Sequence, residues 1–258
     1  MNNNRPIIQV RNLVARYDGQ TVLDRISFDV YGGEILVVIG GSGCGKTTLL
    51  RHMVGLLAPA GGDILYWGKE LTKMDDDERA GLLHRVGIAF QSGALFNSMS
   101  AAENVGLPIE EYGDMDVELK DTLVRMKLSL VGLGNYGDRM PDELSGGMRK
   151  RVGFARSIAM DPEIVFFDEP SAGLDPITAA GLDKLILDMR RLMGATMVVV
   201  THELESIRAV ADRVLMLDGG HIIFSGTLAD AEKSDVPRVR QFFDRAPDKA
   251  IGNTQPQL

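Results

Sequence analysis

Short apolar runs separated by turn residues recur along the whole chain. The segments IIQVRNLVARY and ISFDVYGGEILVVIG come first, and GDILYWGKE and RVGIAF follow. The first segment alternates between apolar and polar residues, which predicts a half-buried strand, whereas the second ends in the fully apolar run of a buried strand. Three later runs, EIVFFDE, TMVVVTHE and RVLMLDGGHIIFSG, predict strands in the second half of the chain.

Helical periodicity dominates the segment from about residue 92 to 160. LKDTLVRMKLSLVGL and MRKRVGFARSIAM both have apolar residues at i, i+3 and i+4 spacing, which is typical of amphipathic helices. GLDKLILDMRRLM predicts another helix between two of the late strands, and KMDDDERA at 73–80 predicts a surface turn and a helix start. Alternating strands and helices predict an α/β fold, in which a parallel sheet has helices on its faces.

Composition and charge narrow the classes of protein. The chain has 258 residues and a formal net charge of −8, so sequence-independent nucleic-acid binding is disfavoured, and we expect no nucleic-acid partner. Its one cysteine, Cys44, excludes an intramolecular disulfide and fits a reducing compartment. The apolar runs are shorter than the roughly 20 residues of a membrane span, and the N-terminus has no apolar signal segment. We therefore expect a soluble protein, which only a partner would hold at a membrane.

A glycine-rich loop follows the apolar strand ILVVI and precedes the helical run TTLLRHMVGLL. The sequence GGSGCGKT at 40–47 satisfies the pattern G-x-x-x-x-G-K-[ST], in which backbone N–H groups surround phosphate oxygens. Lys46 is expected to reach the β- and γ-phosphates of ATP, and the Thr47 hydroxyl to bind Mg²⁺. Cys44 is either a small residue that the loop tolerates or a thiol exposed when the site is empty. The residues predicted to hold the nucleotide here are Gly40, Gly41, Ser42, Gly43, Cys44, Gly45, Lys46, Thr47 and Thr48.

Two carboxylates end the apolar strand IVFF. The carboxyl ends of parallel strands are where ligands bind in open α/β sheets, so Asp168 and Glu169 are expected at the nucleotide. Asp168 suits Mg²⁺, and Glu169 is free to orient and deprotonate an attacking water. The alternative interpretation is a solvated strand end.

A second candidate anion site, Ser145-Gly146-Gly147, precedes the basic helical run MRKR. Free N–H groups at a helix start attract negative charge. One nucleotide does not need two phosphate loops, so we expect two copies to face head to tail. In that arrangement the Ser145 loop of one copy covers the γ-phosphate held by Lys46 of the other.

These motifs, in this order, resemble those of the ATP-binding-cassette ATPases over residues 7–240. The resemblance identifies LSGGM at 144–148 as the family signature and implies a Q-loop glutamine at Gln91 that contacts Mg²⁺. It also implies a D-loop at Asp175, a switch histidine at His202 and stacking of Tyr17 on adenine. A polar residue closing a strand is the alternative for His202, and a half-buried strand aromatic is the alternative for Tyr17.

The resemblance also implies the fold and domain organisation. We expect a P-loop (RecA-like) core, an antiparallel β-subdomain and a helical subdomain inserted at about 92–160. The ATPase domain would span 1–240, and 241–258 would form a tail that binds a partner or stays flexible.

The signature differs from the usual family sequence at its last residue, and the basic run that follows it allows two interpretations. It usually ends in Gln, and here the residue is Met148, which loses the hydrogen bonds of that Gln; Ser145 and Gly147 remain, so we expect hydrolysis to survive. For this basic run, Arg149, Lys150 and Arg151, we expect a solvated helix face in preference to direct contact with phosphate.

The same motifs serve several kinds of ATPase. The short segment between Gln91 and Ser145 leaves no room for the long coiled coil of chromosome-organising members, and the chain has one cassette, unlike translation factors. QSGALF, PDELSGGM, DEPSAGLDPIT and DVPRVRQFFD resemble the ATPases of MCE-type lipid transporters, which include the Mla phospholipid system.

That resemblance implies partners and a location. The partners would be an integral-membrane permease, an MCE-type substrate-binding protein and a STAS-domain subunit, and the location the cytoplasmic face of a bacterial inner membrane. The alternatives are the ATPase of an importer for amino acids or another polar solute, and a soluble ATPase that takes no part in transport.

Overall fold

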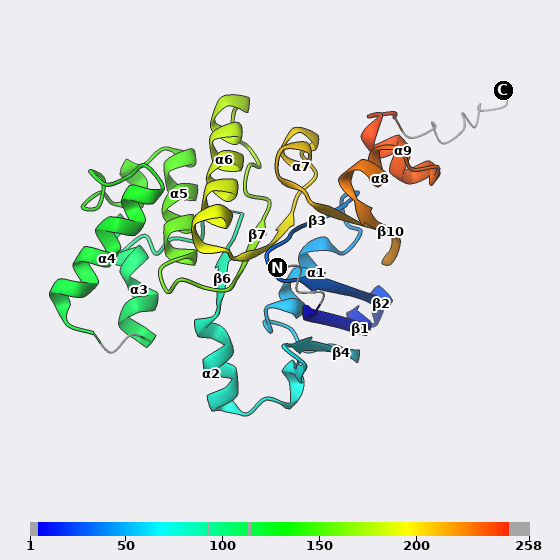
Figure 1. Ribbon diagram of the computed structural model, residues 1–258, viewed down its shortest axis with the longest axis horizontal. Coiled ribbons are helices and arrows are strands. Elements are labelled where there is room, and N and C mark those ends of the chain that lie inside the picture. Colours follow the sequence, from blue (N-terminus) through cyan, green and yellow to red (C-terminus); the bar gives the residue numbers. More distant parts are fainter. Residues whose placement is uncertain (1–4, 92, 113–114, 248–258) are drawn as a thin grey trace, which may run out of the picture.

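Two β-sheets and a set of helices build the computed structural model of the protein, which describes residues 5–91, 93–112 and 115–247 (Figure 1). The smaller sheet is antiparallel and comes almost entirely from the N-terminal quarter of the chain. Its strands, in spatial order, are β2 (Gln20–Tyr31), β1 (Pro6–Tyr17), β4 (Gly61–Tyr66) and β5 (Lys69–Glu70).

The larger sheet is parallel except for one edge strand. The strands β9, β3, β8, β7 and β6 run parallel, and β10 pairs antiparallel with β9. In spatial order the sheet comprises β10 (His221–Thr227), β9 (Arg213–Asp218), β3 (Ile35–Gly40), β8 (Thr196–Val200), β7 (Ile164–Asp168) and β6 (Val86–Ala89). The strand order places β3 and β7 on either side of β8, so their carboxyl ends open at the same edge.

The helices fall into three groups. The α-helices near the sheets are α1 (Lys46–Met53), α2 (Asp76–His84), α6 (Pro176–Met193), α7 (Leu204–Val210), α8 (Leu228–Glu232) and α9 (Pro237–Phe243). A separate helical group contains α3 (Ala101–Tyr112), α4 (Val117–Leu130) and α5 (Gly146–Ser157), and two short 3₁₀ turns are η1 (Leu71–Lys73) and η2 (Pro141–Glu143). Figure 1 shows α3, α4 and α5 together on one flank of the molecule, away from the antiparallel sheet.

The central strands β3, β8 and β7 of the large sheet are buried on both faces, and this explains their apolar sequences. Successive side chains of a strand point to opposite faces. In β3, Ile35, Val37 and Ile39 pack with residues from α5 and α6, whereas Leu36 and Val38 pack with the antiparallel sheet and α1. All five side chains are at most 1% exposed, so the strand that leads into the glycine-rich loop is held from both sides.

A close approach between β6 and α5 fixes the helical group against the sheet. A Cβ atom added at Gly87 would lie 1.9 Å from the carbonyl oxygen of Ser157, so only glycine fits at this position of β6. The aromatic rings of Phe154 in α5 and Phe167 in β7 pack with their centroids 4.8 Å apart. These contacts hold the C-terminal half of α5 against the sheet.

The predicted α/β fold is confirmed, including the antiparallel subdomain and the inserted helices. GDILYWGKE differs from the prediction, because it forms a hairpin in which Trp67 and Gly68 both take positive φ angles and make the turn. The helix predicted over TTLLRHMVGLL ends early, at Met53, because Gly55 takes a φ of +75°. KMDDDERA begins a helix as predicted, with Asp75 accepting a hydrogen bond from the backbone N–H of Glu78.

The C-terminal segment packs beside the glycine-rich loop. The boundary predicted after residue 240 falls inside α9, whose Phe243 is buried, and 248–258 lie outside the described residues.

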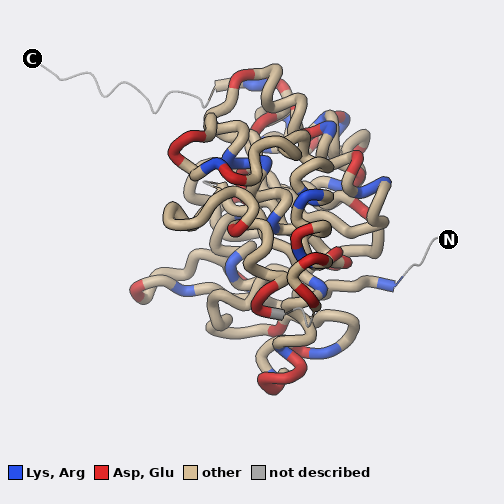
Figure 2. Tube along the Cα trace, turned by 90° about the vertical axis from the view of Figure 1, so that its left-hand side faces the viewer, with Lys and Arg blue, Asp and Glu red and all other residues tan. Residues whose placement is uncertain are grey.

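Figure 2 shows acidic and basic residues interspersed along the chain, with acidic residues gathered at the lower end, where α2 lies. Within the described ranges, no helix combines the length and hydropathy needed to cross a bilayer.

Candidate nucleotide-binding site

The glycine-rich loop joins β3 to α1 in a conformation that only glycine allows. A Cβ atom at Gly40 would lie 2.3 Å from the carbonyl oxygen of Leu217, and one at Gly45 would lie 2.6 Å from the Leu23 side chain. Gly45 has a φ of 104° and provides no side-chain cap, so the first N–H groups of α1 are not satisfied by a capping side chain. This is the local geometry of a phosphate cradle.

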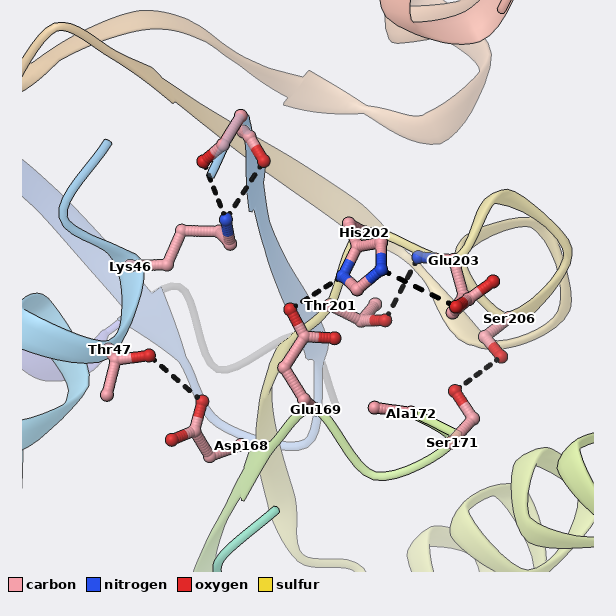
Figure 3. Close-up of polar contacts among 12 residues, drawn as sticks. Lys46, Thr47, Asp168, Glu169, Ser171, Ala172, Thr201, His202, Glu203 and Ser206 are labelled. Carbon is pink, nitrogen blue, oxygen red and sulfur yellow. Dashed lines mark hydrogen bonds and ion pairs between the residues drawn. The ribbon is translucent and has the colours of Figure 1, made fainter. Parts of the chain in front are cut away.

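Lys46 folds back over the loop from the first position of α1. Its Nζ donates to the carbonyl oxygens of Gly40 and Gly41, both at 2.9 Å (Figure 3). The ammonium group is thereby held over the loop, and a phosphate in the cradle would compete with these two carbonyl groups for it.

Thr47 and Asp168 face each other from α1 and the end of β7. The Thr47 hydroxyl donates to Asp168 Oδ1 at 3.4 Å (Figure 3). Burial raises the pKa of the Asp168 carboxyl and the charge of Glu169 raises it further, while Thr47, Arg51 and Lys46 oppose the shift. A hydroxyl and a carboxylate at this distance fit Mg²⁺, which proteins often bind through one carboxylate together with substrate phosphates.

Glu169 lies at the centre of the site in a strained backbone conformation. Its φ is +47°, which is uncommon for a residue with a side chain and is often found at functional sites. The Nδ1 atom of His202 lies 2.9 Å from Glu169 Oε1, whereas Glu169 Oε2 is buried without a hydrogen-bond partner (Figure 3). A buried, unsatisfied carboxylate oxygen is costly, so it points to a group that binds there.

Gln91 and Tyr17 both lie exposed at the ends of strands. The register pairs Ala89 of β6 with Phe167 of β7, so Gln91 follows β6 at the same edge as Asp168. Tyr17 ends β1 with 47% of its surface exposed, which is compatible both with a half-buried strand aromatic and with a ring available for stacking. Its stacking on adenine stays a prediction.

Ser145 begins α5 on the other flank of the molecule. Its Oγ accepts a hydrogen bond from the backbone N–H of Met148 at 3.3 Å, and Ser145 and Gly146 are exposed. The side chain of Met148, where the signature usually has Gln, packs against the core of the helical flank. Figure 1 shows α5 and α1 well apart in one subunit, with α6 and β7 between them.

The predicted D-loop borders the predicted signature loop within the same subunit. A Cβ atom at Gly147 would lie 2.7 Å from the side chain of Thr178, one turn into α6. Asp175 caps α6 by accepting hydrogen bonds from the N–H groups of Ile177 and Thr178 and from the Thr178 hydroxyl. The hydrogen bonds of Thr178 lower the pKa of Asp175, so the cap is ionised at neutral pH.

The prediction of a solvated face for Arg149, Lys150 and Arg151 is wrong. Arg149 donates to the carbonyl oxygen of Leu144 at 2.7 Å, and Arg151 to that of Val131 at 3.0 Å. Lys150 is buried, with its Nζ among three backbone carbonyl groups. A signal was present in the sequence, because Lys150 shares the helical stripe of Phe154 and Ser157, both of which are buried.

Cys44 is buried at 7% exposure, with its sulfur 4.0 Å from Lys46 Nζ. Burial raises the pKa of its thiol, against the opposing effect of Lys46. The side chain therefore suits a small residue packed inside the loop, rather than a reactive thiol.

The fold and this site define a P-loop nucleoside-triphosphate hydrolase. Its second candidate anion site, at the start of α5, lies on the other flank of the same subunit. Residues 23–172 match the family model described as ABC transporter. The chain therefore belongs to the ABC transporter family, as one of its ATPases.

Relatives and solved structures cover nearly the whole chain. It is 38% identical over 245 residues to the intermembrane phospholipid transport system ATP-binding protein MlaF of Escherichia coli strain K12, covering 95% of this chain and 91% of that protein. It is also 38% identical over 238 residues to the probable ribonucleotide transport ATP-binding protein mkl of Mycobacterium leprae, covering 92% and 68%.

A dimeric, post-hydrolysis structure of the ATP-binding cassette MJ0796 with ADP and phosphate matches with a TM-score of 0.78 at 28% identity, over 86% of this chain and 98% of that one. The cbiO1 structure from Clostridium perfringens, part of the transporter complex cbiONQ, matches with a TM-score of 0.79 at 29% identity, over 93% and 96%.

Proposed function

We propose that this chain is the ATPase subunit of a membrane lipid transporter, in which two copies hydrolyse ATP head to tail and drive a separate permease. The observation that carries the proposal is the divided site. The cradle with Lys46 and Glu169 lies at the sheet, whereas the exposed Ser145 loop lies on the opposite flank. Each subunit thus presents two incomplete halves, which a second copy would complete.

The residues of the cradle account for binding of Mg-ATP. Lys46 would leave the carbonyl groups of Gly40 and Gly41 for the β- and γ-phosphates, and Thr47, Asp168 and Gln91 would hold Mg²⁺. When bound, the metal ion neutralises charge on the phosphates. The remaining contacts to ATP would come from Ser42, Gly43, Cys44, Gly45 and Thr48 of the loop, and from Tyr17 at the adenine.

Glu169 and His202 account for the proton transfer. His202 holds Glu169 Oε1 at 2.9 Å, which leaves the buried Oε2 to accept the proton of a water that attacks the γ-phosphate. His202 is 56% exposed at its side chain, so it can reach a phosphate that lies between two subunits. From the partner copy, Ser145, Gly146 and Gly147 would face the γ-phosphate, with Asp175 beside them.

An apolar groove on the helical flank fits a helix of the permease. The groove has a volume of about 500 Å³ and lies between β6 and α3, next to the Q-loop that begins at Gln91. Phe96 is 50% exposed at the groove, and Leu83 is exposed beside it, which suits an apolar partner surface. Glu111 and Arg156 add one charge of each sign.

The name of one group of relatives supports a phospholipid as the transported molecule. MlaF is named for phospholipid transport, and its 38% identity extends over nearly all of this chain. Together with the motifs that resemble MCE-type lipid transporters, this supports a location at the cytoplasmic face of a bacterial inner membrane, with an MCE-type substrate-binding protein and a STAS-domain subunit as further partners.

A polar solute is the second candidate for the transported molecule. The mycobacterial relative is named for ribonucleotide transport, and its identity to this chain is also 38%. The purified complex would carry bound lipid in the first case and bound ribonucleotide in the second, so an experiment can separate the two candidates.

The test is to purify the full chain with its partners from native membranes and to identify proteins and small molecules by mass spectrometry. We expect a multi-span permease and bound phospholipid. Phe96→Asp places a charge in the apolar groove, so it should lose the permease while retaining ATP binding. Val117→Asp, at an exposed apolar residue outside the groove lining, should retain both.

Three results would count against parts of the proposal. A complex with ribonucleotide and no lipid favours the second candidate. Purification without any membrane protein supports an ATPase outside transport. Retention of the permease by Phe96→Asp would place the docking surface elsewhere.

A further inference from the structure

Lys150 lies inside the protein, in the second turn of the helix that carries the signature loop. It is 9% exposed, and its Nζ donates to the carbonyl oxygens of Pro170 and Ala172 at 2.8 Å and of Glu169 at 3.3 Å. An ammonium group has three donors, and these three bonds use all of them. A buried charge is costly unless its hydrogen bonds are made, so this arrangement fixes the carbonyl groups as firmly as it fixes the lysine.

The three carbonyl groups belong to the backbone that follows Glu169. This segment leaves β7 through the positive φ of Glu169, a conformation that needs support from its surroundings. Two further contacts hold it: the Glu169 N–H donates to the carbonyl oxygen of Val200 at 2.8 Å, and Ser171 Oγ lies 3.3 Å from Ser206 Oγ (Figure 3). Lys150 supplies the contact from the helical flank, where α5 lies.

The N-terminus of the same helix carries Ser145. Five positions separate Ser145, the N-cap of α5, from Lys150, and the intervening turn is regular helix. A displacement of the signature loop would therefore reach the Lys150 ammonium and the backbone of Glu169 through α5.

We propose that Lys150 is a positioning residue that holds the Glu169 backbone in place and couples the two nucleotide sites of the dimer. The second half of this statement rests on the proposed head-to-tail dimer. In that dimer, Ser145 contacts the nucleotide of the partner copy, whereas Glu169 acts on the nucleotide of its own subunit. Lys150 joins the two, so engagement of one nucleotide helps to position the base at the other.

Lys150→Met tests the proposal, because methionine keeps the length of the side chain and removes every donor. In the full chain we expect kcat to fall about tenfold or more while KM for ATP stays within about twofold, because Glu169 is displaced and the cradle is unchanged. The Hill coefficient for ATP should fall towards one. Lys150→Arg, which keeps charge and donors, should recover a substantial part of kcat. If Lys150→Met does not fold, Lys150→Leu replaces it with the same expectation, because leucine also has no donor.

Lys127→Met is the matched control. Lys127 is also buried, on α4 in the same helical group, but its Nζ contacts Asp161 and not the Glu169 segment. It should keep kcat and the Hill coefficient even where the melting temperature falls.

Three outcomes would overturn the proposal or one of its halves. An equal loss of kcat in Lys127→Met and Lys150→Met would mean that any buried lysine of this flank has the same effect. An unchanged kcat in Lys150→Met would remove the positioning role. A lowered kcat with an unchanged Hill coefficient would remove the coupling alone, and would leave the composite site itself to the subunit-mixing experiment described below.

Discussion

At the scale of single residues, Glu169 combines three features that lower the stability of the folded protein. It has a positive φ, a buried carboxylate and one oxygen without a partner. Each of these costs stability, and the neighbouring contacts of His202 and Lys150 compensate for part of the cost. Such a group persists where function needs it, and a water placed at Oε2 would satisfy it.

Glu169→Gln should bind ATP and lose turnover. The amide has nearly the shape of the carboxylate, but it cannot accept the proton of the attacking water. We expect kcat to fall by about 10³-fold, which corresponds to about 4 kcal/mol at the barrier, with a long-lived ATP-bound dimer. Steady-state hydrolysis and size-exclusion chromatography with ATP measure the two effects.

Glu205→Gln is the control for this substitution, because Glu205 is highly exposed and pairs with Arg208 on the surface of α7. It should hydrolyse ATP like the original protein. Substantial turnover by Glu169→Gln would mean that another group accepts the proton.

At the scale of elements, a buried polar relay joins α6 and α7 to the D-loop segment. Asp183 of α6 accepts a hydrogen bond from Ser206 of α7 at 2.9 Å, and Ser206 lies 3.3 Å from Ser171. Burial raises the pKa of Asp183, and the hydrogen bond from Ser206 only partly opposes this shift. The native state therefore binds the proton of Asp183 more tightly than the unfolded chain does.

The raised pKa of Asp183 predicts how the stability of Asp183→Asn depends on pH. Above the raised pKa the folded protein holds an ionised, buried carboxylate, and that cost disappears as the pH falls through the raised value. Asparagine keeps the acceptor and has no charge, so Asp183→Asn should be at least as stable as the original protein at pH 7. Its advantage should shrink on acidification towards pH 4, because the original carboxyl group becomes protonated.

Urea unfolding of both proteins over this pH range measures the difference in free energy of unfolding. An advantage that grows as the pH falls would contradict the raised pKa. Asp188→Asn on the exposed face of α6 is the control, because its pKa is lowered by Lys184 and its dependence on pH should have the opposite sign.

At the scale of the whole molecule, the two halves of the proposed composite site lie on different flanks of one subunit. The test is to mix two inactive proteins, Lys46→Ala and Ser145→Ala. A heterodimer of these two contains one site with both halves intact, so an equal mixture should regain about a quarter of the original activity if the sites act independently.

Mixing Lys46→Ala with Glu169→Gln is the control. Lys46 and Glu169 belong to the same half, so every site in that mixture lacks one of them and no activity should return. Recovery in both mixtures, or in neither, would contradict a site completed by the second copy.

Features of this protein that depend on short-range interactions could be predicted from its sequence. The glycine-rich loop, the strand ending at Asp168 and the cap at Ser145 depend on neighbouring residues, and the sequence alone determined them. Local spacing and turn chemistry specify such features, because glycine at Gly40 and Gly45 is required by backbone geometry.

Only the tertiary structure decided which distant residues meet. Three features join segments that lie far apart in the chain: the contact of Lys150 with the backbone after Glu169, the contact between His202 and Glu169, and the groove at Phe96. A charged residue on a helix is usually solvated, and the local sequence does not reveal that a loop 19 to 22 residues away presents three carbonyl groups to it. Long-range packing, and not local propensity, places these groups, because it depends on how whole elements fit against the sheet.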